Sequence, residues 1–455
     1  MNDLVIVILA AGQGTRMRSS KAKVLHPLAG APMLSYVLDT AQSLQPKEVL
    51  VVTGYQGDQV RAALSDYPVK FVHQAQQLGT GHALLQTQAE LAGFKGKLLV
   101  LNGDTPLLTV QTLNNLLTAH QDNALTMLTA VLPDAAGYGR VLRNGQGKAV
   151  GIVEQKDTTP EQAAIREIAT GIYCFTCPLI FSWLMQINCN NAQGEYYLPD
   201  VVVLCHKQGL PMGAQTVSEI NEIQGINDRS QLAQAEVVIR ERINNHWMRR
   251  GVSMINPAVT YIGKQVVLGR DSLIYPQTII EGRSRIGEGC TVGPNCHIVD
   301  SEIDDNVLVR ASCVITESKV GSGAKIGPFS HLRPQAVLEE NAHVGNFVEI
   351  KKSTVGKGSK VNHLTYIGDT QIGKGVNIGA GTITCNYDGV NKHKTIIDDG
   401  VFIGSDTQLV APVHVGENAW IAAGSTITKD VPPEALAISR VHQTHKKNWV
   451  RRRKG

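Results

Sequence analysis

The sequence predicts an α/β domain with a mostly parallel sheet, joined by a long helix to a parallel β-helix of hexapeptide repeats. Three observations support this prediction. Short aliphatic runs alternate with longer mixed segments in the first half, a stretch without Gly or Pro follows, and an aliphatic residue then recurs at every sixth position. We place the three parts at residues 1–227, 228–251 and 252–455.

The first part is predicted to begin with a buried strand and to continue as alternating strands and helices. Its strands are expected at 5–9, 49–52, 98–101 and 125–131, each followed by loop-forming Gly, Asn, Asp or Pro. Ligands in such sheets bind beyond the carboxyl ends of the strands. Segments 10–18 and 102–106 are therefore the expected binding loops.

The connecting helix is predicted over residues 229–250. Asp228 and Gln231 have the spacing of a capping box, and Gly251 follows the last helical residue. The segment is rich in Gln, Ala, Glu, Arg and Ile, which favour a helix.

The second part contains a ladder of aliphatic residues that is typical of a parallel β-helix. The ladder positions are Ile262, Leu268, Ile274, Ile280, Ile286, Val292, Ile298, Ile303, Val309, Ile315, Val320, Ile326, Leu332, Leu338, Val344, Ile350, Val355, Val361, Ile367, Ile372, Ile378, Ile397, Ile403, Leu409, Val415, Ile421 and Ile427. The length of the repeat disfavours a β-sandwich with chance spacing. An interruption at 385–394 predicts an extruded, functional loop.

Composition excludes several classes of protein. With 43% hydrophobic and 18% charged residues, the chain is neither disordered nor a coiled coil. The first apolar run, 4–11, is too short for a membrane span and has no basic segment before it, so we expect a cytoplasmic protein. Cys174 and Cys177 lie three apart on a predicted strand and point to opposite faces, which argues against a zinc or redox site.

The C-terminal tail is basic, but it lacks interleaved aromatic residues and a nucleic-acid-binding fold. We therefore expect a solvated or partner-docked tail and no nucleic acid. Its cations are Lys446, Lys447, Arg451, Arg452, Arg453 and Lys454.

A glycine-containing loop follows the first predicted strand. Gly12 and Gly14 allow backbone N–H groups to approach a phosphate, and Arg16 adds a cation. Met17 stands where a dinucleotide fingerprint has its third glycine, and no Gly-Lys-Ser/Thr follows as in a Walker loop. The glycines alone are equally compatible with a tight turn in an unrelated α/β domain.

Further residues resemble the sugar-1-phosphate nucleotidylyltransferases: segments 23–26 and 78–82, with Gln74, Gly103 and Asp104. Together with segments 137–140, 151–154 and 191–197 and the hexapeptide repeat, nearly the whole chain resembles the bacterial bifunctional N-acetylglucosamine-1-phosphate uridylyltransferases and glucosamine-1-phosphate N-acetyltransferases. The resemblance implies a Rossmann-like nucleotidyltransferase domain and a left-handed β-helix. One of the two implied reactions transfers the uridylyl group of UTP to N-acetylglucosamine-1-phosphate and releases pyrophosphate.

For uridylyl transfer, the resemblance assigns Arg16 and Lys23 to the phosphates, and Asp104 and Asn227 to Mg²⁺. A capping role for Asn227 stays open, because it is adjacent to the predicted helix start. Other implied UTP or UDP-sugar contacts are Leu9, Ala10, Ala11, Gly12, Gln74, Gly79, Thr80, Asn102, Gly103, Gly139, Glu154, Ala169 and Tyr197. The family usually has Asn where this chain has Ala169, a Pro where Ala22 stands, and often a Lys at Ala31.

For acetyl transfer, the resemblance implies acetyl-CoA as donor and His363 as the base that takes the amine proton. Arg333, Lys351, Tyr366 and Asn377 are the implied contacts to glucosamine-1-phosphate. The implied acetyl-CoA contacts are Ala380, Asn386, Tyr387, Ser405, Ala423, Arg440 and Trp449.

By analogy with hexapeptide acyltransferases, we expect a homotrimer. Two alternatives remain: a nucleotidyltransferase whose β-helix only assembles subunits, and a regulatory protein with the same two folds. His363 argues against the first alternative, and Arg16, Lys23 and Asp104 argue against the second.

Overall fold

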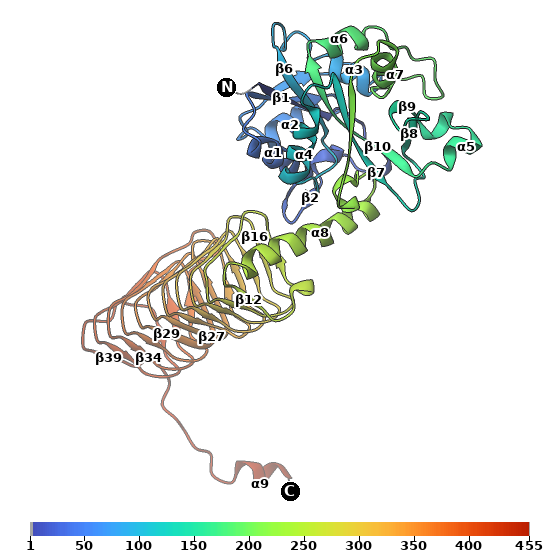
Figure 1. The fold of residues 1–455 in the computed structure, drawn as a ribbon. Helices are drawn as coiled ribbons and strands as arrows, with labels where there is room; N and C mark the ends of the chain where they lie inside the picture. Colours follow the sequence, from blue (N-terminus) through green and yellow to red (C-terminus); the bar gives the residue numbers. More distant parts are fainter. Residues whose placement is uncertain (1–2, 455) are drawn as a thin grey trace. The chain divides into compact units, whose positions relative to one another are not determined.

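The computed structural model describes residues 3–454, and its contacts divide the chain between Ile239 and Arg240 into two compact units. This division lies within helix α8 (Arg229–Met248), whereas the sequence-based boundaries give the helix a segment of its own. Those boundaries, after residues 227 and 251, remain our proposal for the domain limits. Figure 1 shows an α/β fold at the N-terminal end of the chain and stacked coils after α8.

The first unit contains a nine-stranded sheet. Its main path is β11 (Met212–Thr216), β7 (Leu125–Val131), β10 (Glu167–Cys177), β6 (Gly96–Asn102), β1 (Leu4–Ala10), β4 (Glu48–Thr53) and β5 (Lys70–His73). The four predicted strands lie within β1, β4, β6 and β7. β1 is parallel to β4 and β6, and only β10 runs antiparallel to its neighbours on this path. The predicted mostly parallel α/β fold is confirmed.

Helices of the first unit pack on both faces of this sheet (Figure 1). They are α1 (Met33–Ser43), α2 (Gly57–Ala63), α3 (Thr80–Leu85), α4 (Val110–His120), α5 (Pro160–Ala163), α6 (Leu179–Leu184) and α7 (Asp200–Lys207). Alternate strand residues belong to two separate apolar clusters, one on each face. Cys174 and Cys177 belong to different clusters, so their side chains point to opposite faces as predicted.

Helix α8 begins where the sequence predicts, but its cap differs from a standard capping box. The Asp228 carboxylate accepts a hydrogen bond from the Gln231 backbone N–H at 2.9 Å. The Gln231 side chain accepts from the backbone N–H of Asn227 at 2.7 Å, one residue before the cap. The side chain of Asn227 is therefore not needed for capping and remains available for another role.

The second unit is a parallel β-helix of short strands from β12 (Ser253–Met254) to β39 (Leu436–Ala437) (Figure 1). Each strand pairs with the strand one coil later, as in Leu273 with Thr291 and His297 with Val314. Every predicted ladder residue lies in one continuous buried cluster. The six-residue period thus places one aliphatic side chain per strand inside the coil.

The predicted loop interrupts this pairing between β32 (Ile383–Cys385) and β33 (Thr395–Ile397). Tyr387 forms an isolated antiparallel bridge with Lys392, and the Asp388 carboxylate lies 2.6 Å from the His393 ring. Asp388 also accepts backbone N–H groups, and these hydrogen bonds, followed by His393, lower its pKa to about 2. The loop is therefore internally braced.

We predict that Ile286→Ala destabilises the β-helix by about 2–5 kcal/mol, because it removes a fully enclosed ladder side chain. Equilibrium urea unfolding measures the change. The matched variant Arg285→Ala alters the exposed neighbour on the same strand and should shift stability by less than about 0.5 kcal/mol. Equal losses of unfolding free energy in both variants would contradict the placement of Ile286 in the core.

Candidate active sites

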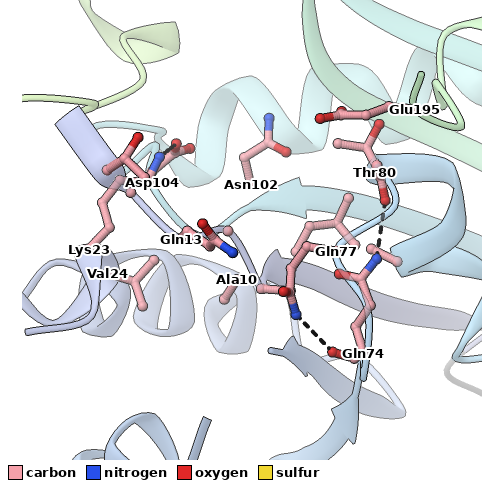
Figure 2. A pocket seen from close by; sticks show the side chains of 17 residues that line it. Ala10, Gln13, Lys23, Val24, Gln74, Gln77, Thr80, Asn102, Asp104 and Glu195 are labelled. Carbon is pink, nitrogen blue, oxygen red and sulfur yellow. Dashed lines mark hydrogen bonds and ion pairs between the residues drawn. The ribbon is translucent and has the colours of Figure 1, made fainter. Parts of the chain in front are cut away.

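A cavity of about 620 Å³ opens at the carboxyl ends of β1 and β6. Figure 2 shows Lys23 and Asp104 at one side of it and Gln74 and Thr80 at the other. Ten predicted UTP-site residues line it: Leu9, Ala10, Ala11, Gly12, Lys23, Gln74, Gly79, Thr80, Asn102 and Asp104. The strand–loop arrangement of an α/β sheet therefore gathers most of the predicted nucleotide site in one place.

Lys23 lies between the two predicted metal ligands. Its Nζ is 2.5 Å from Asp104 Oδ2 and 3.2 Å from Asn227 Oδ1. The backbone N–H of Ile226 donates to the Asp104 carbonyl, which holds the two segments together. A carboxylate oxygen and an amide oxygen thus converge on one cationic group.

The opposite end of the cavity is formed by Gln74 and the loop before α3. Gln74 Nε2 donates to the carbonyl of Gly79, and it lies 2.9 Å from His82 Nδ1. Gly79 has φ +107°, and a Cβ there would lie 2.7 Å from the carbonyl oxygen of Tyr196. Only glycine allows this loop to pack so closely against the 195–197 segment.

A second cavity of about 280 Å³ shares Leu9, Thr80, Asn102 and Glu195 with the first, so the two adjoin. The predicted sugar contacts Gly139, Glu154, Ala169 and Tyr197 all line it. Burial, followed by repulsion from Asp200, Asp157 and Glu195, raises the pKa of Glu154. This side of the site therefore carries several acceptor oxygens in a partly dehydrated space.

Three predicted residues of this half do not line either cavity. Asn227 reaches the site through Lys23, and Gly103 packs against Ala10. Arg16 lies exposed on the 3₁₀ helix η1 (Thr15–Met17), beyond the lining residues. Sequence reasoning missed Gln13, Gln77, Glu195, Tyr173 and Gln193, which line the cavities. Gln13 lies in the expected binding loop 10–18, and Glu195 and Gln193 lie in the quoted segment 191–197. Gln77 directly precedes segment 78–82, so proximity to a motif could have indicated all four.

In the β-helix, the predicted acetyl-transfer residues follow one corner of successive coils. Asn346 pairs with His363 across β27 (His343–Lys351) and β29 (Lys360–Gly368). Backbone hydrogen bonds link His363 to Gly381, Ala380 to Asp406 and Ser405 to Gly424 in the following coils, and Arg440 Nη1 donates to the carbonyl of Ala423. His363, Ala380, Ser405, Ala423 and Arg440 therefore form one line along the corner.

The imidazole of His363 has a defined partner. Its Nδ1 lies 2.9 Å from Asn346 Oδ1. Because the amide oxygen can only accept, this contact places the proton of the neutral ring on Nδ1 and leaves the lone pair on Nε2. Asn346 was not predicted, although it precedes His363 by one coil in the repeat.

Cations gather beside this corner. Arg333 Nη1 is 2.7 Å from Glu349 Oε1, and Lys351 lies close to Lys392 of the extruded loop. Contact with the Lys392 ammonium, followed by burial, lowers the pKa of Lys351. Such repulsion between two ammonium groups is relieved when an anion binds between them. Sequence reasoning missed Lys392, because the irregular loop hides its position.

The hydroxyl of Tyr366 and the amide of Asn386 meet above Gly368. A Cβ on Gly368 would lie 2.5 Å from Tyr366 Oη and 2.7 Å from Asn386 Nδ2, so a larger residue there would displace these two groups. Asn386 Nδ2 donates to Asp369 Oδ2 at 2.5 Å, which fixes the amide.

Three further predicted residues lie outside these contacts. Asn377 is paired with Lys360 on the other side of the His363 corner, and Tyr387 is exposed in the extruded loop. Trp449 lies in the tail helix α9 (Trp449–Lys454) with the Arg453 guanidinium 4.8 Å over its ring. The acetyl-CoA contact of Trp449 remains a prediction.

Comparisons with known proteins match both units. A MobA-like NTP transferase domain matches residues 6–168, bacterial transferase hexapeptide repeats match 265–300 and 317–352, and a hexapeptide repeat of succinyl-transferase matches 394–429. A bifunctional protein GlmU from Syntrophotalea carbinolica is 52% identical over 98% of the chain and 97% of that relative. Another from an Exiguobacterium species is 50% identical over 98% of the chain and 99% of the relative.

The chain belongs to the bifunctional GlmU family. It is a bifunctional transferase, with uridylyl transfer and acetyl transfer as its two activities in the synthesis of UDP-N-acetylglucosamine. The hexapeptide match also identifies the β-helix as left-handed. Within residues 3–454, no helix has the length and apolar character needed to cross a membrane.

We predict that Lys392→Ala raises the KM for glucosamine-1-phosphate roughly 10-fold or more, because the Lys351–Lys392 pair, a candidate anion site, loses one of its two cations. Steady-state acetyl transfer measures this. Lys394→Ala, in the same loop and bonded to Gln371, is the matched control and should leave KM unchanged. A similar rise in both variants would show a general effect of loop charge.

Proposed function

We propose that each unit carries the side chains for one of the two reactions. The β-helix corner transfers the acetyl group of acetyl-CoA to the amine of glucosamine-1-phosphate. The α/β unit then joins the product, N-acetylglucosamine-1-phosphate, to the uridylyl group of UTP. The observation that best supports this division is the contact of His363 with Asn346. It leaves a lone pair on His363 Nε2, and His363 is the first residue of the line along the corner.

In the acetyl-transfer half, His363 Nε2 takes a proton from the amine as its nitrogen attacks the thioester carbonyl. The C–S bond breaks, and CoA leaves as the thiol. Arg333, Lys351 and Lys392 hold the sugar phosphate, while Tyr366, Asn377 and Asn386 orient the ring. The small side chains of Ala380, Ser405 and Ala423 leave space for the pantetheine arm, and Arg440 lies at its phosphate end.

In the uridylyl-transfer half, a phosphate oxygen of the sugar phosphate attacks the α-phosphorus of UTP, and pyrophosphate leaves. Lys23 and Arg16 neutralise the phosphate charges, and the backbone around Gly12 and Gly14 approaches them closely. Gln74, Gly79 and Thr80 bind the uracil. Gly139, Glu154 and Tyr197 bind the sugar in the smaller cavity.

Asp104 and Asn227 fit a Mg²⁺ ion, because their side-chain oxygens already converge on the Lys23 ammonium. Residues 3–454 contain no cluster of three or more His, Cys, Asp or Glu suited to a metal. The proposed site does not require such a cluster, because Mg²⁺ takes the rest of its coordination shell from water and phosphate oxygens. When bound, the ion supplies charge neutralisation for the phosphates.

We also propose that the enzyme is a homotrimer of β-helices. Phe329, Phe347 and Leu364 occupy one corner position in consecutive coils and are 53%, 55% and 62% exposed. The two phenyl rings stack at 5.4 Å, and Leu364 adjoins His363. An apolar strip of this kind beside an open site suits burial against a second copy of the chain, which would also complete the site.

A cytoplasmic location is proposed on the basis of the cysteines. All eight are free thiols, as in proteins of reducing compartments.

The division of labour predicts reciprocal losses. His363→Ala should lower acetyl transfer roughly 10²–10⁴-fold and leave uridylyl transfer intact. Asp104→Ala should lower uridylyl transfer roughly 10²-fold or more and leave acetyl transfer intact. Release of free thiol and of pyrophosphate measures the two reactions separately. The control His297→Ala changes a histidine several coils from His363 and should affect neither. Loss of both activities in either folded variant would contradict two independent sites.

The trimer proposal predicts that the double substitution Phe329→Asp and Phe347→Asp lowers the mass in solution from three copies to one. Acetyl transfer should fall with assembly, whereas uridylyl transfer should persist. Multi-angle light scattering and the thiol assay measure these effects. An unmodified protein that is monomeric at assay concentration would contradict the proposal.

A further inference from the structure

The hydroxyl of Tyr173 has no hydrogen-bond partner among residues 3–454. Tyr173 lies on β10, is 1% exposed, and stacks on Phe175 with the ring centres 5.6 Å apart. Leaving a buried hydroxyl unpaired lowers the stability of the folded protein. Native proteins pair most such groups with protein or water, and Tyr173 is an unpaired one that also lines a cavity.

Tyr173 and Ala169 line the same wall of the 280 Å³ cavity. Both belong to the apolar cluster on one face of the sheet, and the pairing of β10 with β7 shifts register between them. Gly171, with φ +77°, lies in this irregular stretch. Ala169 contributes a methyl group and no polar atom, so Tyr173 Oη is the only side-chain hydrogen-bond donor of these two lining residues.

The surrounding charged groups are acceptors. Glu154 and Glu195 line the cavity, and burial followed by the charges of Glu154 and Asp200 raises the pKa of Tyr173. The hydroxyl therefore stays protonated and can donate. Carboxylates suit the hydroxyl groups of a sugar, which donate hydrogen bonds, but they cannot pair with a carbonyl oxygen.

We propose that Tyr173 Oη donates a hydrogen bond to the acetamido carbonyl of the sugar phosphate, with the Ala169 methyl group against the acetyl methyl. An acetamido group offers an acceptor oxygen and a methyl group together, as this wall requires. This inference rests on the proposed uridylyl-transfer function of the cavity and makes Tyr173 a specificity-determining residue. It also assigns to Tyr173 a contact that Ala169 cannot make.

Tyr173→Phe tests the proposal, because it removes only the hydroxyl. The KM for N-acetylglucosamine-1-phosphate should rise roughly 10-fold, while the KM for UTP and the rate of acetyl transfer stay unchanged. The melting temperature should stay the same or rise, since an unpaired buried polar atom is removed. A structural role for the hydroxyl would give the opposite pattern: a lower melting temperature and an unchanged KM.

Tyr67→Phe is the matched control. Its hydroxyl has a partner, donating to Asp39 Oδ1 at 2.9 Å, and it does not line either cavity. This variant should lose stability and keep both KM values.

Two further measurements identify the ligand group. Glucose-1-phosphate lacks the acetamido group, so its turnover should be equally poor with the unmodified enzyme and Tyr173→Phe. Adding Ala169→Asn to Tyr173→Phe supplies an amide donor on the same wall and should restore part of the lost affinity. An equal loss for both sugar phosphates would overturn the proposal. If the unmodified enzyme released no pyrophosphate from either, the proposed function itself would fail.

Discussion

Each turn of the β-helix places a residue beside the one 17 or 18 positions later, and the acetyl-transfer site depends on this register. The ladder from Ile262 to Ile427 enforces it, because every coil must bury an aliphatic side chain on each face. Residues that are far apart in sequence, such as His363 and Ala423, thereby lie along one corner. The loop at 385–394 is outside this constraint, and it can bring Lys392 and Asn386 to the side of the coils.

The α/β unit has a different constraint. Its candidate site must hold cationic groups close together in the free protein, before any negatively charged ligand binds. Lys23 lies between Asp104 and Asn227, the two residues proposed to hold Mg²⁺. The residues that line the smaller cavity lower the stability of the free protein. Glu154 is buried among other carboxylates, and Tyr173 Oη is unpaired. Both features reduce the stability of the free protein, as is common at functional sites.

Periodicity made much of the fold predictable from the sequence. The ladder, the first strands and the start of α8 follow from spacing alone, because side-chain burial repeats with the geometry of each element. The antiparallel insertion of β10 did not follow, since no local pattern states which strand lies beside which. Most nucleotide-site residues came from resemblance, and the structure gathers them into adjoining cavities.

The missed residues could not be identified from local sequence. Finding Asn346 requires the register of two neighbouring coils, and finding Lys392 requires the path of an irregular loop. Tyr173 has the sequence context of an ordinary core aromatic. Arg16 and Trp449 were predicted from resemblance, yet each lies outside the clusters that the structure forms within one chain.

The central claim is that one chain performs acetyl transfer and then uridylyl transfer. The most direct measurement supplies the unmodified protein with glucosamine-1-phosphate, acetyl-CoA, UTP and Mg²⁺, and follows free thiol and pyrophosphate in the same sample. The account predicts thiol release at once and pyrophosphate release after a lag, with no pyrophosphate when acetyl-CoA is omitted. Pyrophosphate release without a lag, or without acetyl-CoA, would contradict it.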